Sequence, residues 1–124
     1  KEEQQFLDFF MAQMRKAYQN QWGELKEWTV TVSAFGRETT IRFLNYCLRL
    51  VRENFIMNLN VPQLNYLNSA EAAFSSKFSR FINERNVERI ALEFDSAITD
   101  IAGNANAKLV LFDLAVRMCI YLKA

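Results

Sequence analysis

Apolar positions recur along the whole chain at steps of three and four residues, which place them on one face of a helix. The pattern predicts helices over residues 2–21 and 22–35, a long central helix, and three further helices that begin near Asn68, Asn86 and Ala107. Residues 29–33 also alternate like a short strand. No partner strand is evident elsewhere in the sequence, so we favour a helix there.

The central helix carries the strongest apolar pattern. Its two neighbouring apolar rows are Ile41, Leu44, Leu48, Val51 and Phe55, and Phe43, Cys47 and Leu50. A helix that is apolar over so wide an arc is packed from two sides, as in the middle of a bundle. We expect Pro62 to mark its end, because proline lacks an amide hydrogen and disfavours helix directly before it.

The fourth helix has a clear start signal. Asn68 is followed three residues later by Glu71, the spacing of a capping box, in which each side chain bonds the other residue's amide. Beyond this start, Phe74, Phe78 and Phe81 fall at helical spacing. We expect these three rings to belong to the core.

Glycine and asparagine mark other helix boundaries. Gly36 follows the second helix as its expected C-cap. Asn86 begins the fifth helix, and Gly103 with Asn104 ends it. Short turns and the lack of a repeat or linker predict a single all-α domain over residues 1–124, a helical bundle of five to six helices.

The last predicted helix, residues 107–123, is apolar almost all round. Asp113 and Arg117, four residues apart, form nearly its only polar line. Such a helix needs to be covered by other helices or by another subunit. Its apolar stretch, residues 109–122, is shorter than the roughly 20 residues of a membrane span, so we expect no membrane association.

Composition and charge limit the partners. Hydrophobic residues make up 51% of the chain, with eleven phenylalanines, which is core-forming material. The net charge of +1 suits non-specific nucleic-acid binding poorly, because such binding depends on neutralising many phosphates. We therefore expect no direct nucleic-acid binding.

Two cysteines, Cys47 and Cys119, lie far apart inside apolar helical patterns. Isolated thiols of this kind are typical of reduced core residues, which predicts a cytoplasmic protein. The chain begins at Lys1 without a signal-peptide pattern. We interpret it as a piece cut from a longer protein.

The sequence offers little catalytic chemistry. It contains no histidine, the commonest general base and zinc ligand, and none of its three glycines begins a phosphate-binding loop. We predict no catalytic, cofactor-binding or metal-binding residue. The carboxylate pairs Asp95 with Asp100 and Glu84 with Glu88 remain candidates for acid–base work, although a solvated face with salt bridges explains them better.

A row of polar residues follows one side of the central helix at steps of four, three, four and three. These residues are Glu38, Arg42, Asn45, Arg49 and Arg52. One interpretation is a solvated face with the internal pairs Glu38–Arg42 and Arg49–Glu53. The other is a partner-facing row, since arginine is enriched at interfaces and binds carboxylates through two hydrogen bonds.

The turn before the last helix adds three polar residues, Asn104, Asn106 and Lys108. Asparagine is a strong N-cap, which explains one of the two without any function. A lysine in the first turn opposes the helix dipole, and an acidic partner nearby would relieve this. The candidate subunit interface consists of Arg42, Arg49, Arg52, Asn104, Asn106 and Lys108.

Longer strings of sequence carry a resemblance. Residues 43–55, FLNYCLRLVRENF, and 78–86, FSRFINERN, resemble the C-terminal domain of delta-prime subunits of the bacterial DNA polymerase III clamp loader. Residues 104–109, NANAKL, resemble the asparagine-led entry to the last helix of related collar domains. The similarity spans the whole chain.

The resemblance implies a non-catalytic collar domain that packs beside the C-terminal domains of the other clamp-loader subunits and supports loading of the sliding clamp in DNA replication. In that family nucleotide-binding modules precede the collar, and we expect them to be missing here. Two alternatives remain. A helical regulatory or ligand-sensing domain would have an internal pocket lined by several polar groups. A small helical enzyme is disfavoured by the lack of histidine.

Overall fold

The computed structural model describes residues 2–60 and 65–123, and in these ranges it is all-α, as predicted. The elements are α1 (Glu2–Tyr18), α2 (Trp22–Ser33), α3 (Arg37–Asn58), α4 (Ser69–Phe78), the 3₁₀ turn η2 (Ser79–Phe81), α5 (Val87–Ala102) and α6 (Ala107–Tyr121). None of these helices is long and apolar enough to cross a bilayer. Pro62, the predicted stop signal for α3, lies outside the described residues.

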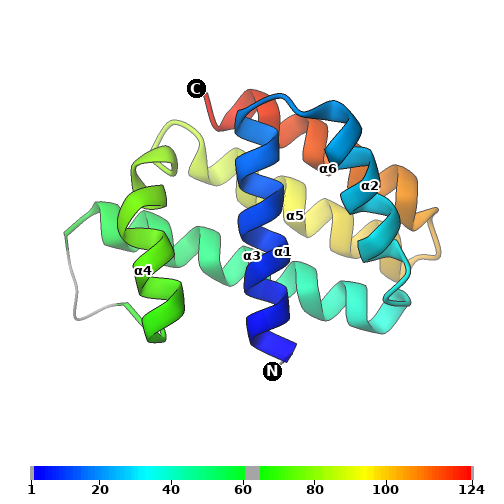
Figure 1. Ribbon diagram of the computed structural model, residues 1–124, viewed down its shortest axis with the longest axis horizontal. Helices are drawn as coiled ribbons and strands as arrows, with labels where there is room; N and C mark the ends of the chain where they lie inside the picture. The colour runs from blue at the N-terminus through cyan, green and yellow to red at the C-terminus, as the bar shows by residue number, and fades with distance from the viewer. Residues whose placement is uncertain (1, 61–64, 124) are drawn as a thin grey trace.

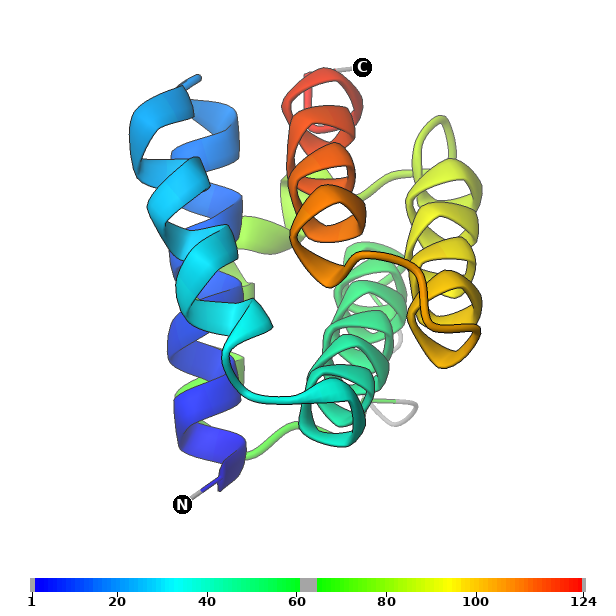
Figure 2. The same ribbon diagram turned by 90° about the vertical axis from the view of Figure 1, so that its right-hand side faces the viewer.

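The helices lie along two main directions, one followed by α3 and α5 and the other by α1 and α4 (Figure 1). α3 and α5 run antiparallel and share the most extensive contact, while α1 crosses α3 and α2 returns along α1 (Figure 1). α6 packs against α5, α2 and α1, which fills the space between the α1–α2 pair and α5 (Figure 2). α4 crosses α3 nearer to the C-terminal end of α3 (Figure 1). The central position predicted for α3 is therefore confirmed.

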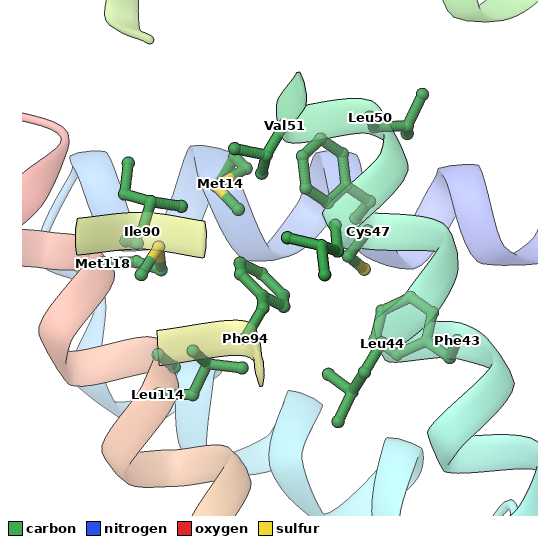
Figure 3. Packing of buried hydrophobic residues seen from close by; sticks show 14 of the residues in the cluster. Met14, Phe43, Leu44, Cys47, Leu50, Val51, Ile90, Phe94, Leu114 and Met118 are labelled. Atoms are coloured by element: carbon green, nitrogen blue, oxygen red, sulfur yellow. The ribbon is translucent and has the colours of Figure 1, made fainter. Parts of the chain in front are cut away.

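The core is formed by apolar side chains from all the long helices. The rings of Phe10, Phe43 and Phe94 are fully buried. In Figure 3, Phe94 of α5 points toward Cys47 of α3, with Met118 of α6 on its other side. One contiguous cluster thus joins α1, α3, α5 and α6.

The first two helices end earlier than the apolar pattern predicts. α1 ends at Tyr18 because Asn20 takes a left-handed conformation, with φ 56°. Residues 29–33 are helical, and α2 ends at Ser33. Gly36 is the residue before α3, with φ 91° and ψ 160°. Its predicted role as the C-cap of α2 is wrong: it serves the entry to α3, in a conformation that glycine adopts without strain.

The capping box at the start of α4 is confirmed. The Glu71 amide donates to Asn68 Oδ1 over 2.8 Å, and the Asn68 amide donates to Glu71 Oε1 over 3.0 Å. The helix stops at Phe78, so Phe81 belongs to η2. Phe78 is buried, whereas Phe74 and Phe81 are half-buried against the core.

Candidate protein-binding surfaces

Arg42 lies on the surface and binds α1. Its Nη2 donates to Glu2 Oε2 over 3.0 Å and to Thr39 Oγ1 over 3.1 Å. The hydrogen bond from Arg42 lowers the pKa of the Glu2 carboxyl. The predicted direct pair between Glu38 and Arg42 is not formed, because the guanidinium turns toward α1. Both side chains of the observed pair are about half exposed, so the pair contributes little to stability.

Arg49, by contrast, is bound to a buried carboxylate. Its Nη2 donates to Glu71 Oε2 over 2.7 Å, and its Nη1 donates to the Tyr66 carbonyl over 2.9 Å. The side chain of Glu71 is only 2% exposed. The predicted pair with Glu53 is wrong: Glu53 Oε1 accepts from Asn65 Nδ2 and from the Tyr66 amide, both over 2.9 Å. Arg49 thus fastens α4 and the segment before it to α3.

Tyr46 completes this buried polar cluster. Its hydroxyl donates to Glu71 Oε2, the same oxygen that accepts from Arg49. Burial, followed by the hydrogen bond to Glu71, raises the pKa of Tyr46, so the phenol remains a donor at neutral pH. With the Asn68 amide, Glu71 accepts from three donors. Such donors offset the cost of removing a carboxylate from water.

This cluster was not predicted from the sequence, in which Glu71 was expected only to form the capping box of the fourth helix. The available signal was a tyrosine and an arginine three residues apart, Tyr46 and Arg49, beside the wide apolar arc of the central helix. Their partner lies more than 20 positions along the chain. Spacing within one helix cannot identify such a partner.

Asn104, Asn106 and Lys108 lie in or just after the α5–α6 turn, which is close to the N-terminal end of α3. Asn104 has φ 70°, and its Oδ1 accepts from the guanidinium of Arg37 at the start of α3. Asn106 is the N-cap of α6, and its Oδ1 accepts from the Leu109 amide over 3.2 Å. Lys108 is exposed in the first turn. The turn is therefore fixed by the two asparagines, and the prediction of a capping asparagine is confirmed.

The six candidate residues do not form one cluster. Arg49 is bound against α4, whereas Asn104 contacts the start of α3. Among the described residues, no hydrogen bond or ion pair joins the three arginines to the three turn residues. Arg42, Arg52 and Lys108 are exposed, and Arg42 is bonded to Glu2 and Thr39.

α6 presents an apolar row to solvent. Leu109 and Ile120 are 70% and 65% exposed, and Phe112 and Val116 are half-buried between them. Steps of three, four and four place these residues on one side of the helix. We call them the α6 row. The opposite face is buried against α1, α2 and α5 through Leu111, Leu114, Ala115, Met118 and Cys119. Other helices of the domain thus cover only part of this helix, which was predicted to be apolar almost all round.

Asp113 and Arg117 of α6 border the α6 row. Arg117 Nε donates to Asp113 Oδ2 over 2.9 Å, and Arg117 Nη1 lies 3.5 Å from Glu93 Oε2 of α5. The hydrogen bond to Asp113 is the main cause that raises the pKa of Arg117. This side of the row therefore has a charged edge held by ion pairs.

The chemically reactive side chains are buried or dispersed. Cys47 and Cys119 are buried free thiols, and burial raises the pKa of each. The carboxylates of both proposed acid–base pairs are exposed. Within residues 2–60 and 65–123, no three acidic or cysteine side chains gather as a metal site requires. Comparison with protein-family models, curated proteins and solved structures found no match.

Proposed function

We propose that this chain is the collar domain of a delta-prime subunit of a bacterial clamp loader, where it holds loader subunits together in the cytoplasm. Its residues 43–55, 78–86 and 104–109 support this role through their resemblance to that family. The all-α bundle is compatible with a collar. The structural observation that carries the proposal is the α6 row.

Single exposed apolar residues are ordinary on protein surfaces. The two exposed and two half-buried residues of the α6 row, on one side of one helix, form a continuous strip, and apolar strips with a polar border are typical of interface centres. The α6 row has such a border in Asp113 and Arg117. A helix from the equivalent domain of a neighbouring subunit would remove this strip from water.

In this proposal the polar candidates have different roles. Lys108 precedes the α6 row and, with Arg42 and Arg52, is exposed for contact with a partner. Asn104 and Asn106 fix the turn from which the row begins. Arg49 serves folding, because it is bound to Glu71. The domain has no catalytic residue or cofactor of its own and acts through protein contacts, without touching DNA or a membrane.

The alternative of a ligand-sensing domain predicts an internal pocket with several polar groups. The groove that the structure forms between α1 and α4 has mostly apolar walls and is open to solvent. It does not favour that alternative.

The test is co-purification of the full-length subunit with the other loader subunits. The double substitution Leu109→Glu with Ile120→Glu should weaken complex formation by about tenfold or more, because it places charge in the centre of the interface. Leu59→Glu with Leu92→Glu is the matched control, since both leucines are more than half exposed outside the α6 row.

Circular dichroism of each variant separates a lost contact from a lost fold. We expect helical content and melting temperature to stay near those of the parent in both double variants. Equal complex formation by the two would contradict the proposed role of the α6 row.

A further inference from the structure

A groove of about 630 Å³ runs between α1 and the α4–η2 segment. Figure 1 shows these two helices at separate points along α3. The walls are mainly apolar and come from both sides. They consist of Met11, Met14, Arg15, Tyr18 and Gln19 from α1 and the residue after it, and Ala70, Ala73, Phe74, Lys77, Phe78 and Phe81 from α4 and η2.

The groove exists because of the way α4 is attached. The face of α4 that is fully buried carries Glu71, Ser75 and Phe78, two of them polar. These polar residues bond α3: Glu71 accepts from Arg49, and Ser75 Oγ accepts from Asn54 Nδ2 over 3.0 Å. The apolar side of α4 consequently faces α1 and contacts it at Phe10, and Phe74 and Phe78, which make this contact, also line the groove.

The aromatic part of the groove is tightly packed. Phe74 and Phe78 stack with their ring centroids 5.0 Å apart, and each lies 6.0 Å from Phe10 of the core. The α1 wall carries the half-buried Met11, beside Met14, which is buried in the core. Methionine side chains are flexible and adapt to different apolar partners. The groove thus combines a fixed aromatic side with an adaptable one.

The charge of the groove has one sign. Arg15 lies on the α1 wall and Lys77 on the α4 wall, and no carboxylate lines either wall. In the part of the chain that the structure describes, neither cation has an acidic partner within 4.0 Å. At one end, Arg80 lies over the Phe81 ring at 5.0 Å and Lys123 over the Tyr18 ring at 5.5 Å, which adds two more cations.

From this combination we infer that the groove binds an amphipathic helix with acidic residues on both flanks of its apolar face. An apolar groove accepts such a helix through anchors at positions i, i+3 or i+4, and i+7. α4 has ten residues and is about 15 Å long, which matches two to three turns of a bound helix. Arg15 and Lys77 would face carboxylates on opposite flanks. This surface involves none of the α6 row, so the inference is independent of the proposed collar function.

The experiment uses the 124-residue chain and two fluorescein-labelled synthetic helices. One helix has leucine anchors at i, i+4 and i+7 with flanking glutamates, and the other has flanking lysines. Fluorescence anisotropy should show at least about tenfold tighter binding of the acidic helix. Arg15→Glu with Lys77→Glu should reverse this preference, whereas the control Lys26→Glu with Arg89→Glu, two exposed cations outside the groove, should preserve it.

A second variant tests the site itself. Ala73→Tyr fills the groove from the α4 wall and should abolish binding of the acidic helix, whereas Ser76→Tyr, on α4 outside the groove, should retain it. Equal affinity for the two helices, or binding that survives Ala73→Tyr, would overturn the inference. Self-association of the chain that Ala73→Tyr removes would also overturn the inference, because the groove would then bind a second copy of the chain. Uptake of dodecanoate there, without preference between the helices, would assign it to a fatty acyl chain.

Discussion

Glu71 is a buried carboxylate with two roles, one local and one long-range. Oε1 accepts from the Asn68 amide and completes the capping box, while Oε2 accepts from Tyr46 and Arg49 of α3. One side chain therefore starts α4 and holds it against the centre of the bundle. Removing its charge would leave the Tyr46 hydroxyl without its charged acceptor and Arg49 without its ion-pair partner.

Glu71→Gln should destabilise the domain by about 1.5–3 kcal/mol, the range for a hydrogen bond to a charged group. We expect the lower part of this range, because Arg49 is partly exposed and water can hydrate its guanidinium when the ion pair is lost. Urea denaturation followed by circular dichroism measures this change. Glu88→Gln, at an exposed position in the first turn of α5, is the control and should stay within about 0.5 kcal/mol of the parent. Equal midpoints for the two variants would mean that the buried cluster contributes nothing.

The raised pKa of Tyr46 predicts a loss of stability in alkali. The folded state holds the phenol proton more tightly than the unfolded state, whose tyrosine pKa is about 10. The contribution is therefore fully present below about pH 10 and is lost above it, at up to about 1.4 kcal/mol per pH unit for this group. Burial raises the pKa of Cys47 in the same direction, so the thiol adds to the loss.

Urea melts at a series of pH values from about 7 to 11 measure this dependence. Tyr46→Phe removes the titrating group, so its stability should fall less steeply in the alkaline range, although its stability at neutral pH is lower. Curves of equal slope for the parent and Tyr46→Phe would show that the phenol does not titrate differently in the two states.

At the scale of elements, the sequence predicted the helices well and their ends less well. Helical spacing and the Asn68 capping box located α4, and Asn106 located the start of α6. The predicted end of α1 was wrong because Asn20 takes a left-handed conformation. Asparagine can adopt this conformation, but its presence in a sequence does not predict it. The role of Gly36 was misjudged for a related reason: in a short connection, one glycine follows one helix and precedes the next.

Asn86 shows how a correct boundary can hide another role. It occupies the N-cap position of α5, but its side chain bonds no amide of that helix. Its Oδ1 accepts from the Asn83 amide over 2.9 Å, and its Nδ2 donates to the carbonyls of Phe81 and Tyr121 over 2.8 and 2.9 Å. This buried amide joins η2, the start of α5 and the end of α6.

Asn86→Ala should cost about 2 kcal/mol, because it leaves three partly buried backbone groups without this partner. Asn45→Ala is the matched control: that side chain is exposed and donates only to the Ile41 carbonyl of its own helix. Chemical denaturation of both variants provides the comparison. Asn86→Ala with the stability of the control would mean that water replaces the lost hydrogen bonds at little cost.

At the scale of the whole molecule, the sequence predicted a bundle with a central α3 but not the neighbours of each helix. Helical periodicity shows which face is apolar, and it carries no information on which other helix covers that face. The polar row of α3, which contains Arg42, Arg49 and Arg52, shows how this lack of information misleads. Its residues were grouped by spacing along one helix, yet Arg42 bonds α1 and Arg49 bonds α4. The α6 row could be predicted as an excess of apolar residues, whereas which part stays exposed depended on how α1, α2 and α5 pack around it.

The unequal burial of the helices predicts unequal local stability. α3 and α5 form the most extensive contact and bury many apolar side chains, whereas α4 buries one, Phe78, beside the polar Glu71 and Ser75. Regions with few buried apolar contacts open with a smaller free energy than the core. The amides of α4 should therefore exchange with deuterium faster than those of α3 and α5 in the native state.

Hydrogen exchange followed by mass spectrometry or NMR measures this difference, and a variant tests its cause. Glu71→Gln should speed exchange in α4 more than in α5, by about tenfold for each 1.4 kcal/mol of local stability lost, because the buried cluster is the main attachment of α4 to α3. Ser76→Ala is the control, since the Ser76 hydroxyl bonds only the Ala73 carbonyl within α4. If α4 exchanged as slowly as α5 in the parent chain, the bundle would open as one cooperative unit. Faster exchange of both helices in Glu71→Gln, to the same extent, would show that the cluster stabilises the whole domain.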